Sequence, residues 1–316
     1  MKPLIFVVSS AFNEQENVKP LYYRVKEQFD RLSDKYDFQY LILDNASTDN
    51  TLAELKKLAA EEKQLGVVAN MRNFGHIRSP YYGIMLSLQT RAAAVIYLAS
   101  DLQDPPELIP EFIKKWEEGY KVVFGQKTSS RENKFIYFLR GLYYKLLRKF
   151  NDSGANLLEQ CTGFGLFDRE VIERLAKIDD PYPYLRGIVG ELGYPAALIP
   201  FKQPRRFGGI TKNNWYTLYD NAMLGFTNHS RLPLRIAAIG GFILSILSIL
   251  TAFVYFVLKL LFWNSFPMGQ APLLIAVFFF FSVQLFFMGI IGEYLGAVLT
   301  QLLKRPMVIE KERINF

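Results

Sequence analysis

The sequence predicts an α/β domain with a parallel sheet covered on both faces, followed by two helices long enough to span a membrane. One observation is a repeat in which an apolar, strand-like run leads into a polar loop and then into a helical pattern. The other is a pair of long uncharged runs in the last quarter of the 316 residues.

Four apolar runs are typical of buried parallel strands: Leu4–Ser10, Phe38–Leu43, Gly66–Ala69 and Ala94–Leu98. Each ends in a polar segment, and the carboxyl ends of parallel strands lie along one edge of a sheet. We therefore expect a ligand at that edge, and a nucleotide-type ligand is the leading hypothesis. The chain has no Gly-x-Gly-x-x-Gly and no Gly-Lys-Ser/Thr loop, which excludes a dinucleotide fingerprint and a P-loop.

The polar segment after the fourth run, Ala99–Glu107, contains candidate ligands for a divalent cation. Asp101 and Gln103 are two residues apart, so their oxygens can converge on one hard cation where a strand becomes a loop. Mg²⁺ or Mn²⁺ with a substrate diphosphate would suit such a partly open site. The alternative is an acidic turn before a helix, because Asp-x-x-Asp-Pro turns are common.

The formal net charge is +7, and basic residues cluster at 131–149, at 202–212 and beside the uncharged runs. Together with membrane segments, this basicity indicates anionic lipid or phosphate as a partner before nucleic acid. The one cysteine, Cys161, cannot form an internal disulfide, which fits a reducing compartment.

Two uncharged runs, Ile236–Leu258 with 23 residues and Ala271–Gly292 with 22, exceed the roughly 20 needed to cross a bilayer. A buried soluble helix is the alternative. The hairpin between them, residues 263–270, has no basic residue, whereas Lys and Arg flank the other ends. The positive-inside rule then places the domain and both termini in the cytoplasm, at the inner membrane.

The organisation expected from these features has four parts. They are an α/β domain over residues 1–212, an amphipathic interfacial helix over 213–232, a two-helix membrane hairpin over 233–303 and a cytoplasmic C-terminal tail over 304–316.

Several segments together resemble one known family. They are Asn13-Glu14-x-x-Asn17, Asp44-Asn45-Ala46-Ser47-x-Asp49-x-Thr51, Ser100-Asp101-Leu102-Gln103-Asp104-Pro105-Pro106-Glu107, Arg205–Lys212, and Gly292-Glu293-Tyr294 with Arg305-Pro306. The chain resembles family 2 glycosyltransferases of the GT-A fold, which is Rossmann-like. Within them it is most similar to the polyisoprenyl-phosphate glycosyltransferases related to dolichyl-phosphate mannose synthase.

The resemblance implies an inverting enzyme that uses Mg²⁺ or Mn²⁺ to move a sugar from a nucleoside diphosphate to a polyisoprenyl phosphate on the cytoplasmic leaflet. The sequence departs from the family pattern at two positions. Asn45 stands where a second Asp is usual, and Ala99 stands where the Asp-x-Asp form has its first Asp. This leaves Asp101 and Gln103 as the metal-facing pair.

The resemblance also implies the site residues. Those expected at the nucleotide sugar are Ala11, Phe12, Asn13, Glu14, Asp44, Asn45, Arg72, Asn73, Ser79, Ser100, Asp101, Arg206 and Lys212. Those expected at the lipid phosphate are Arg131, Arg140 and Tyr144, for which a solvated basic face is the alternative. Those considered for catalysis are Asp101, Glu159 and Asp152. A base is optional, since a phosphomonoester with a second pKa of about 6 is mostly dianionic at neutral pH.

UDP-glucose and undecaprenyl phosphate are the expected substrates, giving lipid-linked glucose for surface polymers. Asp44 and Asn45 suit a uracil edge but could also serve guanine, so an enzyme using GDP-mannose is the first alternative. A membrane-tethered nucleotide-sugar-binding protein with impaired catalysis is the second. A processive polysaccharide synthase is disfavoured because Gln-x-x-Arg-Trp is absent. The oligomeric state is open, with a homo-oligomer among the options.

Overall fold

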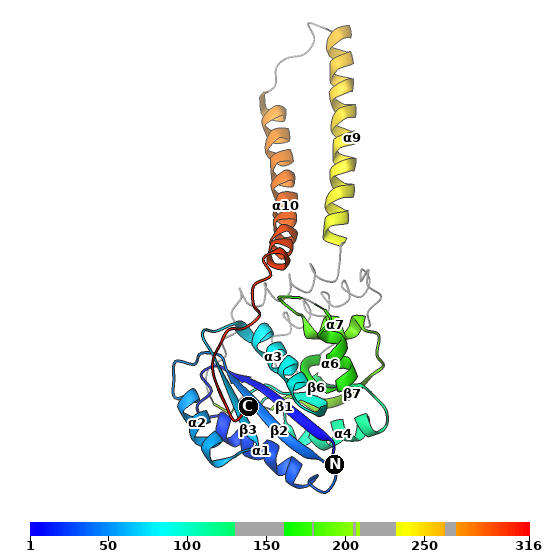
Figure 1. Cartoon of the computed structure of the whole chain (residues 1–316). Coiled ribbons are helices and arrows are strands. Elements are labelled where there is room, and N and C mark those ends of the chain that lie inside the picture. The colour runs from blue at the N-terminus through cyan, green and yellow to red at the C-terminus, as the bar shows by residue number, and fades with distance from the viewer. Residues whose placement is uncertain (130–160, 179, 205–206, 209–231, 263–269) are drawn as a thin grey trace.

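Four parallel strands form the centre of the sheet: β1 (Leu4–Ala11), β2 (Asp37–Asp44), β3 (Leu65–Asn70) and β4 (Ala92–Tyr97). β1 pairs with β2 and β4, and β2 pairs with β3. The computed structural model describes residues 1–129, 161–178, 180–204, 207–208, 232–262 and 270–316 (Figure 1). The parallel pairing of β1 to β4 confirms the expected α/β domain, with its four central strands near their expected positions.

The sheet is mixed, however, and not wholly parallel as expected. Its order is β7-β5-β6-β4-β1-β2-β3-β8. β5 (Val122–Ser129) and β7 (Ala196–Lys202) pair parallel to each other, whereas β6 (Cys161–Asp168) and β8 (Glu310–Ile314) run antiparallel to their neighbours. The physical reason is that apolar patterning identifies a strand but carries no information about the direction in which the chain crosses the sheet.

Helices cover both faces of the sheet, which explains why the central strands are apolar at nearly every position. α1 (Val18–Asp30), α2 (Thr51–Glu61) and α4 (Ile109–Glu117) pack on one face. α3 (Gly75–Leu86), α6 (Arg169–Leu175) and α7 (Leu185–Glu191) pack on the other. Two 3₁₀ turns, Ser87–Gln89 and Pro106–Leu108, complete the described domain.

The C-terminal strand β8, which lies in the segment 304–316 expected as a C-terminal tail, pairs with β3 at the edge of the sheet. Glu310 pairs with Asn70 at the carboxyl end of β3, and the Met71 N–H donates to the Ile309 carbonyl at 2.9 Å. The ring of Phe316 lies 5.9 Å from that of Phe6. The chain thus leaves the domain before α9 and returns to its carboxyl edge after α10.

Two long helices, α9 (Leu232–Leu261) and α10 (Gln270–Leu302), project from the domain side by side (Figure 1). They pack closely at Gly240, where a Cβ would lie 3.2 Å from the Phe287 ring. Among the described residues, one segment, Phe279–Leu302, is long and apolar enough to cross a membrane, and Ile236–Leu247 is a shorter apolar segment. The second span therefore stays a prediction, and residues 213–231 of the expected interfacial helix lie outside the described residues.

Both helices expose large apolar side chains to their surroundings. Phe242 is 73% exposed on α9, and Phe286 is 65% exposed on α10. A contiguous apolar surface of this kind calls for lipid or a partner, because soluble proteins rarely leave one in water. The structure therefore supports association with a membrane.

Gly165→Ala should destabilise the domain by about 1–3 kcal/mol, because a methyl group at this position of β6 would collide with the Val123 carbonyl oxygen of β5. A thermal unfolding curve of the purified protein in detergent measures this. The matched control is Gly289→Ala in α10, where the new methyl meets no atom of the described residues within 4 Å. Equal unfolding temperatures for the two variants would contradict the β5–β6 packing described here.

Candidate active site

The loops that follow β1, β2 and β3 are bonded to one another at the carboxyl edge. The Asn13 N–H donates to Ser47 Oγ at 2.9 Å, and the Glu14 N–H donates to Thr51 Oγ1 at 2.8 Å. These two bonds join the β1 loop to the β2 loop. The Phe74 N–H donates to Asn45 Oδ1 at 2.9 Å, which joins the β2 loop to the start of α3. The polar segments singled out in the sequence thus form one continuous surface.

Backbone strain gathers at the same edge. Asn13 (φ 56°), Ala46 (φ 58°) and Leu102 (φ 60°) adopt the left-handed conformation, one in each loop after β1, β2 and β4. For residues other than glycine this conformation costs on the order of 1 kcal/mol or more, and it persists only where the surroundings hold it. Such strain is common at ligand sites, where it directs neighbouring groups toward the ligand.

A second feature of this edge is a set of buried polar atoms without a partner. The atoms of this kind found in the described part of the chain are Asn17 Oδ1, Asp44 Oδ1, Asn70 Oδ1, Arg78 Nε and Ser100 Oγ. Asp44 and Asn70 end β2 and β3, Asn17 and Ser100 lie in the loops after β1 and β4, and Arg78 lies in the first turn of α3. Leaving a buried polar group unsatisfied costs about 1–3 kcal/mol, so their convergence marks a place where a polar ligand completes the bonding.

Asp44, the last residue of β2, is 1% exposed. Its Oδ2 accepts the Ser47 N–H at 3.2 Å, whereas Oδ1 has no partner. Burial raises the pKa of this carboxyl group, against the bonds from Ser47 that lower it. Asp44 therefore presents one buried oxygen that is available to accept an N–H or O–H from a ligand.

Asn45 was expected to offer its amide to a base, but the structure uses that amide within the protein. Its Nδ2 donates to Asn73 Oδ1 at 2.9 Å and to the Gly75 carbonyl at 3.2 Å. Its Oδ1 accepts from Asn70 Nδ2 at 3.1 Å as well as from the Phe74 N–H. Contact between Asn45 and a base stays a prediction, whereas its bonds to the β3–α3 loop are observed.

The loop after β4 presents Asp101 and Gln103 on a backbone bent by Leu102. Asp101 Oδ1 accepts the Gln103 N–H at 3.1 Å, and the buried Asp104 closes the loop through a 3.0 Å bond from the Ala99 N–H. Gln103 Oε1 accepts from Gln203 Nε2 at 3.0 Å. The loop after β7 therefore lies against the loop after β4.

Asp101 and Gln103 carry oxygen atoms that suit a hard divalent cation. They would supply only part of its ligands. Across the described ranges no group of three or more His, Cys, Asp or Glu side chains could hold a metal. Mg²⁺ is commonly held by one or two carboxylates together with substrate phosphates and water, so one carboxylate and one amide oxygen are compatible with it.

The described part of the basic segment 205–212 reaches the β1 loop. Asn17 Nδ2 donates to the Gly208 carbonyl at 3.3 Å. A Cβ on Gly208 would collide with Glu16 Oε2, so glycine permits this close approach. Gly208 thus lies beside Asn17, one of the residues with an unpartnered polar atom.

Comparison with known protein families identifies the family to which the domain with this edge belongs. The profile described as "Glycosyl transferase family 2" matches residues 6–176, which is more than half of the chain. The chain belongs to glycosyl transferase family 2. The matched residues include the described loops after β1, β2, β3 and β4. The predicted class of enzyme, a glycosyltransferase, is confirmed, and it is carried by the α/β domain described above.

Individual relatives match over nearly their whole length. The uncharacterized glycosyltransferase sll0501 of Synechocystis sp. is 31% identical over 96% of this chain and 93% of its own. The putative glycosyltransferase CsbB of Bacillus subtilis is 30% identical over 98% and 92%, and the bactoprenol glucosyl transferase of Shigella phage SfX is 28% identical over 98% and 99%. The similarity to the bactoprenol glucosyl transferase confirms the expected resemblance to glycosyltransferases that act on lipid phosphates.

Other residues expected to bind the nucleotide sugar lie at or near the carboxyl edge of the sheet. Some are buried and some are exposed. Ala11 is buried at the end of β1, and Phe12 follows it. Ser79 is fully buried and accepts bonds from Ser10 Oγ and Asn70 Nδ2, both at 3.1 Å. Arg72 is exposed, with its guanidinium carbon 4.2 Å from the centre of the Phe74 ring.

Some expected residues of the glycosyltransferase lie outside the described residues, so their roles stay predictions. They are Arg131, Arg140, Tyr144, Asp152, Glu159, Arg206 and Lys212. Conversely, Asn70 and Arg78 are at the site although sequence reasoning did not propose them. Asn70 could have been found from its pattern, because it is a polar residue that ends a buried strand, as Asp44 does.

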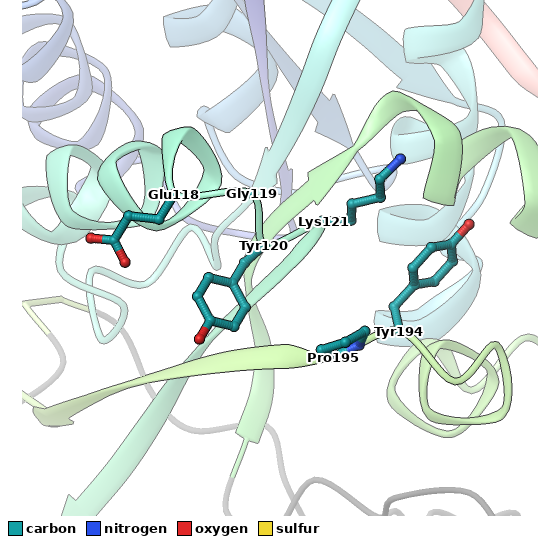
Figure 2. Close-up of a pocket in the computed structure, with 6 residues that line it drawn as sticks. All are labelled: Glu118, Gly119, Tyr120, Lys121, Tyr194 and Pro195. Atoms are coloured by element: carbon teal, nitrogen blue, oxygen red, sulfur yellow. The ribbon is translucent and has the colours of Figure 1, made fainter.

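The glycosyltransferase also has a hollow of about 380 Å³ at the opposite edge of the sheet (Figure 2). It is lined by Glu118, Gly119, Tyr120, Lys121, Tyr194 and Pro195, which precede β5 and β7. Lys121 forms an ion pair with Glu170, and Glu118 pairs with Lys115. With its charges paired and no unpartnered buried atom among its lining residues, this hollow is not the candidate active site.

Asp44→Asn should weaken the binding of a nucleotide sugar and also stabilise the fold at neutral pH. Because burial raises the folded pKa of Asp44, the parent loses stability as pH rises from the unfolded pKa of about 4 through the folded value. The stabilisation of the variant should therefore grow over that window, stay constant above it and vanish below it.

Unfolding temperatures of the two proteins between pH 3.5 and 8, with calorimetric titration of UDP, measure both effects. Asp37→Asn at the opposite edge is the matched control for UDP binding. Unchanged UDP affinity in Asp44→Asn would contradict the role of Asp44, and a stability difference independent of pH would contradict the burial of its charge.

Proposed function

We propose that this glycosyltransferase transfers glucose from UDP-glucose to a polyisoprenyl phosphate, such as undecaprenyl phosphate, at the cytoplasmic face of a membrane. The observation that carries the proposal is the set of unpartnered buried polar atoms at the carboxyl edge, beside Asp101. The bactoprenol glucosyl transferases that match nearly the whole chain support both the sugar and the acceptor.

The geometry around Asp44 favours a uridine donor over a guanosine donor. Uracil presents one N–H between two carbonyl groups, which suits the one unpartnered oxygen of Asp44. Guanine presents two adjacent N–H donors that pair best with both oxygens of a carboxylate. Since Oδ2 of Asp44 already accepts the Ser47 N–H, the second bond to guanine would be weaker. GDP-mannose is therefore the less favoured donor.

The donor diphosphate would lie between the loop after β4 and the loop after β7, which meet at Gln103 and Gln203. Asp101 and Gln103 would hold Mg²⁺ or Mn²⁺, which supplies positive charge to the leaving diphosphate. Arg206 and Lys212 belong to the segment that contains Gly208, and we propose that they donate to the diphosphate from above the edge.

In the proposed reaction an oxygen of the lipid phosphate attacks the anomeric carbon of glucose. The new bond joins that carbon to the lipid phosphate oxygen, and the bond to the UDP oxygen breaks, so that UDP leaves and the configuration inverts. At neutral pH the acceptor is already largely dianionic, so no proton must be removed and neither Glu159 nor Asp152 is required as a base. Arg131, Arg140 and Tyr144 are the proposed contacts of the lipid phosphate.

The topology of the chain supports two membrane spans. The N-terminal strand β1 and the C-terminal strand β8 belong to the same sheet, so any crossing of a membrane by the chain between them must be matched by a return crossing. Two crossings, by α9 and α10, satisfy this requirement. We propose the boundaries 1–212, 213–232, 233–303 and 304–316 for the membrane-related organisation, with the domain and both termini in the cytoplasm.

Asp101→Ala should lower transfer of radiolabelled glucose from UDP-glucose to undecaprenyl phosphate by about 100-fold or more, because it removes the carboxylate proposed to act on the leaving diphosphate. EDTA should have the same effect on the parent. Glu111→Ala, an exposed acidic residue of α4, is the matched control and should transfer at the parent rate.

Full transfer by Asp101→Ala, or in EDTA, would overturn the role of Asp101 and of the cation. If the parent binds UDP-glucose and never transfers glucose to the lipid, the chain is a nucleotide-sugar-binding protein instead. Transfer from GDP-mannose and not from UDP-glucose would identify the alternative donor.

A cysteine in place of Ser265 should react with a membrane-impermeant maleimide in whole cells, because the uncharged hairpin is expected outside. A cysteine in place of Lys311, exposed on β8, should react only after lysis. Cys161 gives no background, since it is buried and burial raises the pKa of its thiol to about 11. The reverse labelling pattern would contradict the cytoplasmic site.

A further inference from the structure

Two arginines that begin the β3–α3 region share one aromatic ring. The guanidinium carbon of Arg72 lies 4.2 Å from the centre of the Phe74 ring, and that of Arg78 lies 5.7 Å from it. Arg78 also lies 5.5 Å from the ring of Tyr182, so two aromatic rings hold its side chain in place. The result is a rigid cationic cluster, which we call the α3 arginine cluster and define as Arg72, Phe74, Arg78 and Tyr182.

Neither arginine is neutralised within the described part of the chain. No carboxylate there forms an ion pair with Arg72 or Arg78, and Arg78 Nε is buried without an acceptor. Burial lowers the pKa of Arg78, and the neighbouring charge of Arg72 lowers it further. Two like charges beside one ring, with no carboxylate partner in the described residues, favour the binding of an anion.

The position of Arg78 in the helix strengthens this preference. It lies in the first turn of α3, a helix of 12 residues, where the helix dipole disfavours a cation and favours an anion. The N-cap residue is Phe74, whose side chain cannot accept from the free N–H groups of that turn. The Gly75 N–H donates to Asn73 Oδ1 at 2.8 Å, so an anion here would be held by the guanidinium groups and the remaining N–H groups of the first turn.

The cluster adjoins the candidate active site. The Phe74 N–H is bonded to Asn45, the residue after Asp44, so the cluster is anchored to the end of β2. Figure 1 shows α3 and α7 on the side of the domain from which α9 and α10 project, which is the side a lipid acceptor would approach. Arg78, in the first turn of α3, therefore lies on the helix whose start adjoins the candidate active site.

We propose that Arg78, together with Arg72, binds a phosphate group of a substrate at the start of α3. The proposal rests on the proposed function and adds Arg78 as a substrate-binding residue. Phosphate is the anion that fits, because a planar guanidinium donates two parallel bonds to two phosphate oxygens. The lipid phosphate and the donor diphosphate share this chemistry, and kinetics of each substrate distinguish them.

The test compares Arg78→Gln and Arg78→Lys with the parent and with Arg91→Gln. Arg91 is the matched control, because it forms a 2.8 Å ion pair with Asp37 at the opposite edge of the sheet. Calorimetric titration with inorganic phosphate and with pyrophosphate measures anion binding without any transfer. Loss of one bidentate charged contact should weaken that binding about tenfold in Arg78→Gln and less in Arg78→Lys, with no change in Arg91→Gln.

Steady-state transfer then identifies the source of the phosphate. A rise of about tenfold in the KM for undecaprenyl phosphate, with the KM for UDP-glucose unchanged, assigns the lipid phosphate, and the opposite split assigns the donor. Parent-like phosphate and pyrophosphate affinity in Arg78→Gln, in protein that unfolds at the parent temperature, overturns the proposal. If the parent shows no transfer, the proposed reaction fails, and the titrations still decide whether Arg78 binds phosphate.

Discussion

The hydrogen bonds of one side chain, Asn45, tie together the parts from which the candidate active site is built. Its oxygen accepts from Asn70 at the end of β3 and from the Phe74 N–H at the start of α3, and its nitrogen donates to Asn73 and Gly75. Because donors and an acceptor are both needed, a carboxylate could not make the same set of bonds. The departure from the family motif at this position therefore has a structural role in this chain.

The arrangement around Asn45 leaves other polar groups of the edge buried and unsatisfied. Asp44, Asn70 and Ser100 each have a side-chain atom without a partner, and each lies at or next to the carboxyl end of a strand of the parallel core. Together with the left-handed backbone at Asn13, Ala46 and Leu102, these groups lower the stability of the free protein. Proteins commonly retain such features where a ligand compensates them, so stability and binding are in conflict at this edge.

The attachment of the hairpin brings this edge and the membrane together. β8 pairs with the carboxyl end of β3 at Glu310, eight residues after α10 ends at Leu302. An extended chain of that length spans at most about 28 Å, so the end of α10 must lie near the loops that follow the parallel strands. The proposed transfer from a soluble nucleotide sugar to a lipid phosphate requires such proximity, since the phosphate cannot move far from the headgroup layer.

Some features of this protein follow from local sequence pattern, and others follow only from contacts between distant segments. The four central strands, the polar edge and the long apolar helices could be predicted from the sequence, because burial of apolar runs and the shared edge of parallel strands depend on local pattern. Only the tertiary structure decided that the sheet is mixed and that β8 completes it, since strand direction and pairing are set by contacts between distant segments. It likewise decided that Asn45 is bonded within the protein and that Arg78 is held between Phe74 and Tyr182 without a carboxylate partner in the described residues. The availability of a polar group for a ligand depends on which neighbours satisfy it, and those neighbours come from loops far apart in the sequence.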